Sequence, residues 1–194
     1  MPDSLKERGG LKKSMNTEFH YYIIHFLAQK AGFSRNEAYI IAYSSQFVDS
    51  NIIQYEINLL QGRYQTLVTQ NYGFWEESCP RDVYMPFHFL PGDPDFTAGR
   101  RRDGQKNLLS CTPNSPGVKR LLIQALKTRN LYRVGIGLHT FADSYAHQNF
   151  SGKLEAWNEL GTPTIEGTVI PGIGHAQALT NPDIITMRWS DPRL

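Results

Sequence analysis

Three side chains that can bind a metal recur at four-residue intervals in the stretch GIGLHTFADSYAHQNF, residues 135–150. They are His139, Asp143 and His147. On a helix, each step of four residues turns only about 40° beyond a full turn, so the three share one side. Their neighbours are mostly apolar or aromatic, and a carboxylate buried between two imidazoles is costly unless a positive charge neutralises it. A divalent cation is the simplest such charge, because zinc-class metals bind imidazole nitrogen and carboxylate oxygen.

Apolar residues at helical spacing, bounded by capping residues, predict four helices. These helices cover residues 17–31, 34–47, 115–130 and 131–148. The second begins with a capping box, Ser34 followed by Glu37, and the last two have Ser115 and Asn130 as N-caps. No strand is convincing, and residues 50–115 are expected to form long irregular connections. We therefore expect an all-α domain of several helices.

Length and composition predict one domain. A chain of 194 residues is long enough for a single domain with a sizeable core. Residues 1–14 are polar and contain glycine, so we expect a disordered tail there and one metal-binding domain over residues 15–194. Short helical segments are expected near residues 153–160 and 174–189. The abrupt end at WSDPRL also fits a domain that is incomplete at its C-terminus.

Charge and hydropathy limit the classes of partner. The net charge of +2 is too small to indicate nucleic acid or an anionic membrane as a partner. The chain has no apolar run of about 18 residues, which argues against a transmembrane helix, and its basic start lacks the apolar segment of a signal peptide. Cys79 and Cys111 lack a C-x-x-C pattern, so they indicate no thiolate metal site, although a single disulfide stays open. We expect a cytoplasmic protein, and the oligomeric state is left open.

Four residues elsewhere in the chain complete a candidate metal site. His20 lies on the first helix, Asp49 at the C-terminal rim of the second, His88 at the edge of a proline-rich loop, and His175 after the glycine-rich segment GIG. Taken alone, each is more often a hydrogen-bonded core or surface residue. His25 lies on another face of the first helix and is interpreted as structural. The candidate metal ligands are His20, Asp49, His88, His139, Asp143, His147 and His175.

In this order the candidate ligands resemble those of the zinc-dependent phospholipase C and P1 nuclease superfamily. Those enzymes are all-α hydrolases with two or three metal ions. Their ligands are an early His, an Asp, a His, a helix with H-x-x-x-D, and further His residues. GLHTFADSYAHQNF is the strongest local match. The segments MNTEFHYYI, AYSSQFVD, FHFLPGD, TPNS and HTFADSYAHQNF also resemble an uncharacterised bacterial family.

The resemblance implies a phosphoesterase that uses two or three zinc ions and a metal-activated water. One metal would be held by Asp49, His88, His139 and Asp143, and a second by His147 and His175. Asp143 would bridge, His20 would complete the cluster beside it, and Asp49 would alternatively orient the attacking water as a base. The implied substrate is a small phosphate ester or a phospholipid head group, and the charge argues against long nucleic acid.

Two departures from the superfamily leave other functions open. Its secreted enzymes begin with a Trp whose amino end binds a metal, and this chain has no Trp there. They also carry an acid one turn after the last His, where this chain has Leu179, and Asp183 is the candidate substitute. One alternative is a non-catalytic metal-binding protein whose ligand set is saturated. The other is an all-α binding module, without metal, whose histidines are polar core or surface residues.

Overall fold

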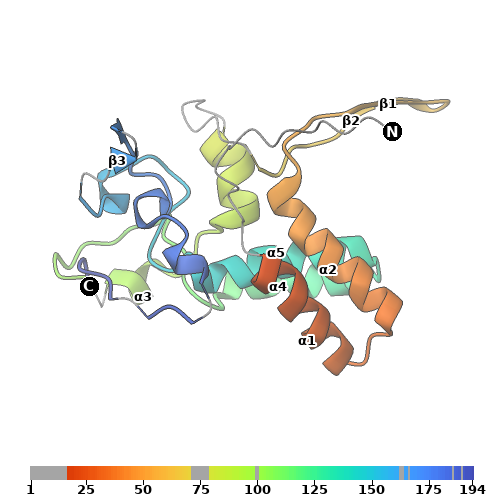
Figure 1. The fold of residues 1–194 in the computed structure, drawn as a ribbon, viewed down its shortest axis with the longest axis horizontal. Coiled ribbons are helices and arrows are strands. Elements are labelled where there is room, and N and C mark those ends of the chain that lie inside the picture. The colour runs from red at the N-terminus through yellow and green to blue at the C-terminus, as the bar shows by residue number, and fades with distance from the viewer. Residues whose placement is uncertain are drawn as a thin grey trace, which may run out of the picture.

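A layer of packed helices forms the body of the protein (Figure 1). The structure is a computed structural model, and it describes residues 17–70, 79–98, 101–161, 164–165, 167–184, 186–188 and 190–194. Helix α5 (Leu131–Ala146) packs against both α2 (Arg35–Ser50) and α4 (Pro116–Lys127). Helix α1 (Ile24–Lys30) packs on α2 and continues a π-helical segment, η1 (Glu18–Ile23). The core between these helices consists mainly of Ile24, Ala28, Ala38, Ile41, Ala42 and Val134.

The close approach of α5 to α2 depends on Gly135. A Cβ atom at this position would lie 2.4 Å from the carbonyl oxygen of Ile41 and 2.6 Å from the Cβ atom of Ser44. Protein interiors are too densely packed to absorb such an overlap without a shift of the backbone. The missing side chain therefore lets the polar face of α5 lie beside the C-terminal half of α2, which carries Asp49.

The predicted N-caps are confirmed. The Ser34 hydroxyl accepts the backbone N–H of Glu37 at 3.3 Å, and the Glu37 carboxylate accepts that of Ser34 at 2.8 Å. Ser115 and Asn130 each accept the N–H of the residue three positions further on, at 3.3 and 3.1 Å. Helix α2 continues past its predicted end at residue 47, so Asp49 lies within its last turn.

The prediction of an all-α domain is wrong. The described residues include one antiparallel hairpin of β1 (Glu56–Leu59) and β2 (Gly62–Gln65) and a shorter one of β3 (Thr164–Ile165) and β4 (Thr168–Val169). All residues of β1 and β2 are exposed, so these strands add nothing to the buried core. Polar and apolar residues do alternate in EINL and in RYQ. This signal of a half-buried strand is too short to stand out among irregular connections.

Short elements replace the helices expected near residues 153–160 and 174–189. These are the 3₁₀ turns η3 (Ala156–Asn158), η4 (Ala176–Ala178) and η5 (Asn181–Asp183). The middle of the chain contributes a π-helical segment, η2 (Pro80–His88), and the short α3 (Pro94–Ala98).

Cys79 and Cys111 are buried and are not joined to each other by a disulfide. The tail predicted over residues 1–14 lies outside the described residues. Among the described residues, no helix has both the length and the apolar character needed to cross a membrane.

Candidate metal centre

Five of the predicted ligands form one buried group, here called the inner cluster. It consists of His20, Asp49, His88, His139 and Asp143. These residues come from η1, the last turn of α2, the end of η2 and the middle of α5. None of them is more than 5% exposed. Because these residues come from four separate elements, it is the packing of those elements that brings them together.

Asp143 lies at the centre of the inner cluster. Its Oδ1 is 3.0 Å from Nε2 of His20, and its Oδ2 is 3.1 Å from both Nδ1 of His88 and Nε2 of His139. Those two ring nitrogens are also 3.1 Å apart, so they form an equilateral triangle with Oδ2. Two ligands at about 2.0–2.1 Å from one tetrahedral zinc ion lie roughly 3.3 Å from each other. The triangle is therefore close in size to one face of such a coordination shell.

Backbone carbonyl groups orient three of the histidine rings. Nε2 of His88 donates to the carbonyl oxygen of Thr69 at 2.7 Å. Nδ1 of His147 donates to the carbonyl oxygen of His88, and Nδ1 of His175 to that of Leu179, each at 2.8 Å. A carbonyl oxygen can only accept, so in the neutral rings the other nitrogen carries the lone pair and faces the carboxylates. Metal-binding histidines are oriented in this way.

A second group, the outer cluster, consists of His147, His175 and Asp183. Oδ1 of Asp183 lies 3.5 Å from Nε2 of His147 and 3.6 Å from Nε2 of His175. His147 follows the last residue of α5, and its Nδ1 still lies 3.8 Å from Oδ2 of Asp143. The two clusters therefore meet at Asp143. The outer cluster is the more open one, because the side chains of His175 and Asp183 are 16% and 20% exposed.

Several buried polar atoms of the inner cluster have no hydrogen-bond partner among the described residues. They are Oδ2 of Asp49, Oδ1 of Asp143, and Nδ1 of both His20 and His139. The 3.0 Å contact of His20 with Asp143 is thus an approach of two polar atoms without hydrogen-bond geometry. Leaving a buried acceptor unsatisfied costs about 1–3 kcal/mol, and more for a charged group. A cation between these atoms would offset that cost for the carboxylates.

Electrostatic interactions decide where protons lie in the metal-free centre. Burial raises the pKa of Asp143, but the charges of His139 and His147 outweigh it and hold this pKa well below 3.8. Burial lowers the pKa of His147, but Asp143 and Asp183 outweigh it and raise this pKa to about 9. Burial is the main cause of the lowered pKa of His139 and of His175. At neutral pH the metal-free centre therefore contains an ionised Asp143 and a protonated His147.

The two clusters contain all seven predicted ligands together with Asp183. Leu179, which stands where the resembled superfamily has an acid, contributes its backbone carbonyl instead. The carboxylate comes from Asp183, because the turns η4 and η5 fold the chain back toward His175. The eight-residue separation would also fit a helix, but the segment forms two separate 3₁₀ turns with Leu179 at φ +56° between them, so helical periodicity does not explain this approach. His25 belongs to neither cluster, and its ring stacks on Tyr21 at 6.3 Å.

Aromatic rings pack against the outer cluster. Phe89 stacks on the ring of His147 with 4.3 Å between centroids, and Phe150 meets His175 edge-on at 6.1 Å. Gly174 has φ +50°, and a Cβ atom there would lie 2.4 Å from the Phe89 ring. Glycine at this position therefore lets the backbone that carries His175 come close to Phe89.

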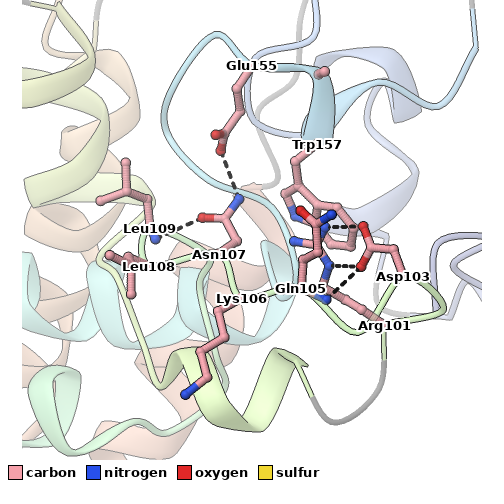
Figure 2. A pocket seen from close by; sticks show the side chains of 10 residues that line it. Arg101, Asp103, Gln105, Lys106, Asn107, Leu108, Leu109, Glu155 and Trp157 are labelled. Carbon is pink, nitrogen blue, oxygen red and sulfur yellow. Dashed lines mark hydrogen bonds and ion pairs between the residues drawn. The ribbon is translucent and has the colours of Figure 1, made fainter.

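A separate cavity of about 710 Å³ is lined by none of the eight cluster residues (Figure 2). On its wall, Arg101 packs over the ring of Trp157 at 3.7 Å and forms an ion pair with Asp103. Glu155 accepts a hydrogen bond from Asn107 at 3.0 Å. Because these charged groups already interact with neighbours, the cavity gives little basis for selecting a charged ligand.

No curated protein and no solved structure matches the sequence. A sequence model of a family of unknown function, DUF6765, matches residues 15–193. Because that match covers nearly the whole chain, the protein belongs to the DUF6765 family.

Proposed function

We propose that this protein is a metal-dependent hydrolase, and specifically a phosphoesterase with a zinc-type centre of two or three ions. The observation that carries the proposal is the convergence of five imidazoles and three carboxylates in two adjoining clusters. Imidazole nitrogen and carboxylate oxygen are a donor set that zinc-class ions accept readily. The order of these donors, which resembles that of the zinc-dependent phospholipases C and P1 nucleases, supports phosphate ester chemistry.

The inner cluster offers two overlapping sets of ligand atoms. His20, His139 and Asp143 form one set, and Asp49, His88 and His139 form the other, with the atoms of each set within 4.8 Å of one another. The outer cluster would hold a further ion. Zinc-class ions bound here would act as Lewis acids and lower the pKa of a coordinated water. Asp143 touches both clusters and so is the residue expected to bridge ions.

The chain's own residues suit the remaining tasks of a hydrolase. Oδ2 of Asp49 has no hydrogen-bond partner among the described residues, so it is available to orient an attacking water and accept its proton. The partly exposed outer cluster gives substrate a route from solvent, and the Phe89 ring shields one side of it. We propose a small phosphate ester or a phospholipid head group as substrate, because the net charge of +2 does not favour long nucleic acid.

Metal analysis of the purified protein tests the first part of this proposal. Inductively coupled plasma mass spectrometry should find at least two equivalents of zinc or another divalent metal per chain. Hydrolysis of bis(p-nitrophenyl) phosphate should depend on that metal and stop with a chelator. The proposal would be contradicted if the purified protein contained no metal and took up none from a zinc solution.

A pair of histidine variants tests the ligand assignment. His20→Ala removes a ring that contacts Asp143, whereas His25→Ala removes a ring of the same N-terminal helical segment that lies in neither cluster. The first should lower metal content and hydrolysis together, because loss of even an indirect metal contact typically costs 10–100-fold. The second should leave both unchanged. Equal behaviour of the two variants would contradict the assignment.

A non-catalytic metal protein is the second candidate, and the burial of the inner cluster favours it. Structural zinc sites are closed by protein ligands, and every residue of the inner cluster is at most 5% exposed. In that case metal would be present and would stabilise the fold, while phosphate esters and carboxylic esters would both remain uncleaved. A screen of the metal-loaded protein against both ester classes separates the two candidates.

A further inference from the structure

The hairpin of β1 and β2 has one apolar face that the rest of the molecule leaves exposed. Ile57 pairs with Tyr64, and alternation along β1 places Tyr55 and Leu59 on the same side. These four side chains are between 44% and 55% exposed, and Leu60 in the turn is fully exposed. We call these five residues the ribbon face. In Figure 1 the hairpin extends away from the helices.

The opposite face of the hairpin is polar. It carries Glu56, Asn58, Arg63 and Gln65, and Glu56 forms an ion pair with Arg63 at 3.3 Å. The hairpin is therefore amphipathic, and every residue of its two strands is exposed. An isolated two-stranded hairpin is at best marginally stable in water, and packing of its apolar face is what normally stabilises it.

Helix α2 carries a second exposed apolar surface, the aromatic row. Tyr39, Tyr43 and Phe47 follow one another at four-residue spacing, with ring centroids 6.1 Å apart at each step. Each is between 45% and 53% exposed, while the opposite side of α2 is buried in the core. Single exposed aromatic residues are normal, but an ordered row on one helix together with an exposed ribbon face on the following hairpin marks an interaction surface.

The two surfaces match in length and in area. From Tyr55 to Leu59 the ribbon face spans about 14 Å at the rise of a strand. From Tyr39 to Phe47 the aromatic row spans about 12 Å at the rise of a helix. At roughly 100 Å² for each half-exposed side chain, the eight side chains offer on the order of 800 Å² per copy, the area that a standard interface buries on each partner.

We propose that a second copy of this chain covers both surfaces. The ribbon face of each protomer lies on the aromatic row of the other, so that one two-fold contact buries two copies of each surface. A second copy is favoured over a lipid surface because the chain itself provides two apolar surfaces of similar length that can cover each other. The proposal goes beyond the hydrolase function and does not depend on it.

Light scattering after size-exclusion chromatography tests the proposal on the full-length, metal-loaded protein. At micromolar concentration the mass should be twice that of the 22.1 kDa chain. Ile57→Lys, on the ribbon face, and Tyr43→Glu, on the aromatic row, should each raise the dissociation constant at least about tenfold, because each buries an unpaired charge. Asn58→Lys is the matched control, since it adds the same charge on the polar face, and it should stay dimeric.

Mixing the two monomeric variants tests the contact itself. In the mixed pair, Lys from Ile57→Lys meets Glu from Tyr43→Glu at one contact, and the other contact has the original residues, so the dimer should return. A monomeric wild-type protein, unaltered dimerisation of either variant, or no recovery on mixing would each overturn the proposal. Binding of a monomeric wild-type protein to phosphatidylcholine vesicles would overturn it in favour of a lipid surface. Because neither the ribbon face nor the aromatic row contributes a residue to either cluster, metal content should be the same in every variant, which keeps this test separate from the proposed function.

Discussion

A proton on His147 competes directly with any cation that binds the outer cluster. The pKa of this ring is about 9 in the metal-free protein, above its ordinary value of 6.5. Asp143 and Asp183 raise it because their negative charges favour the protonated ring. At neutral pH the ring must therefore lose its proton before its Nε2 can bind a metal.

This competition predicts how zinc affinity depends on pH. Since the proton is retained up to about pH 9, affinity should rise between pH 6.5 and 9 and level off above that range. A chromophoric zinc chelator used as a competitor gives the apparent dissociation constant at each pH. Affinity that stays constant from pH 6.5 to 9 would contradict the proposed role of His147.

At the residue scale, the candidate ligands that lie together were predictable from the sequence, but the groups that orient them were not. The spacing of His139 and Asp143 predicts that they lie on one side of a helix, because helical geometry fixes which residues share a side. The carbonyl groups of Thr69 and Leu179 leave no such pattern, since every residue type has a carbonyl. Asp183 was only partly predictable. Its carboxylate made it a candidate from the sequence, but its position beside His175 depends on two 3₁₀ turns.

At the scale of elements, the contact between α2 and α5 is the packing that brings Asp49 close to His139 and Asp143 in the inner cluster. Gly135→Ala should lower the free energy of unfolding by about 1–3 kcal/mol, because the new methyl group would overlap the carbonyl oxygen of Ile41. It should also weaken metal binding by moving Asp49 relative to Asp143. Urea unfolding with and without zinc measures both effects.

Gly117→Ala is the control for that variant. A Cβ atom at residue 117 would have its nearest neighbours at 3.8 Å, an ordinary contact, within the first turn of α4. The substitution should leave stability unchanged or raise it by less than about 1 kcal/mol, since alanine favours a helix more than glycine does. A similar loss of stability in both variants would show that the approach at Gly135 is not the cause.

Helix starts were well predicted, and the strands were missed. Ser34, Ser115 and Asn130 signal helix starts because a side-chain oxygen satisfies a backbone N–H locally. The strands of the first hairpin bury no residue, so their alternation does not reflect burial against the core of the described residues. A contact with a second protomer, as proposed above, would explain why an amphipathic pattern exists there at all.

At the scale of the whole molecule, bound metal should act as a cross-link. The proposed ligands run from His20 to Asp183, so the ions would join nearly the full length of the described chain. Removing them should lower Tm by on the order of 10 °C, as expected for a ligand that binds only the folded state tightly. Differential scanning calorimetry before and after dialysis against EDTA measures the change.

Two controls complete the chelation experiment. EDTA saturated with zinc cannot extract the ions, so it should leave Tm where it was. Adding zinc back to the depleted protein should restore the original value. If EDTA alone has no effect on a protein shown to contain metal, the ions do not cross-link the fold.

The hydrogen bonds to His88, His147 and His175 have a consequence for how related chains can diverge. In all three bonds the acceptor is a main-chain carbonyl, at Thr69, His88 and Leu179. The side chain at residue 69 also helps to hold its acceptor in place, because Oγ1 of Thr69 donates to the carbonyl oxygen of Val48 at 2.7 Å, and Leu179 has φ +56°. An insertion or deletion near either residue would displace the carbonyl itself. Within the family, the loops around these two residues should therefore resist changes of length more strongly than changes of residue type.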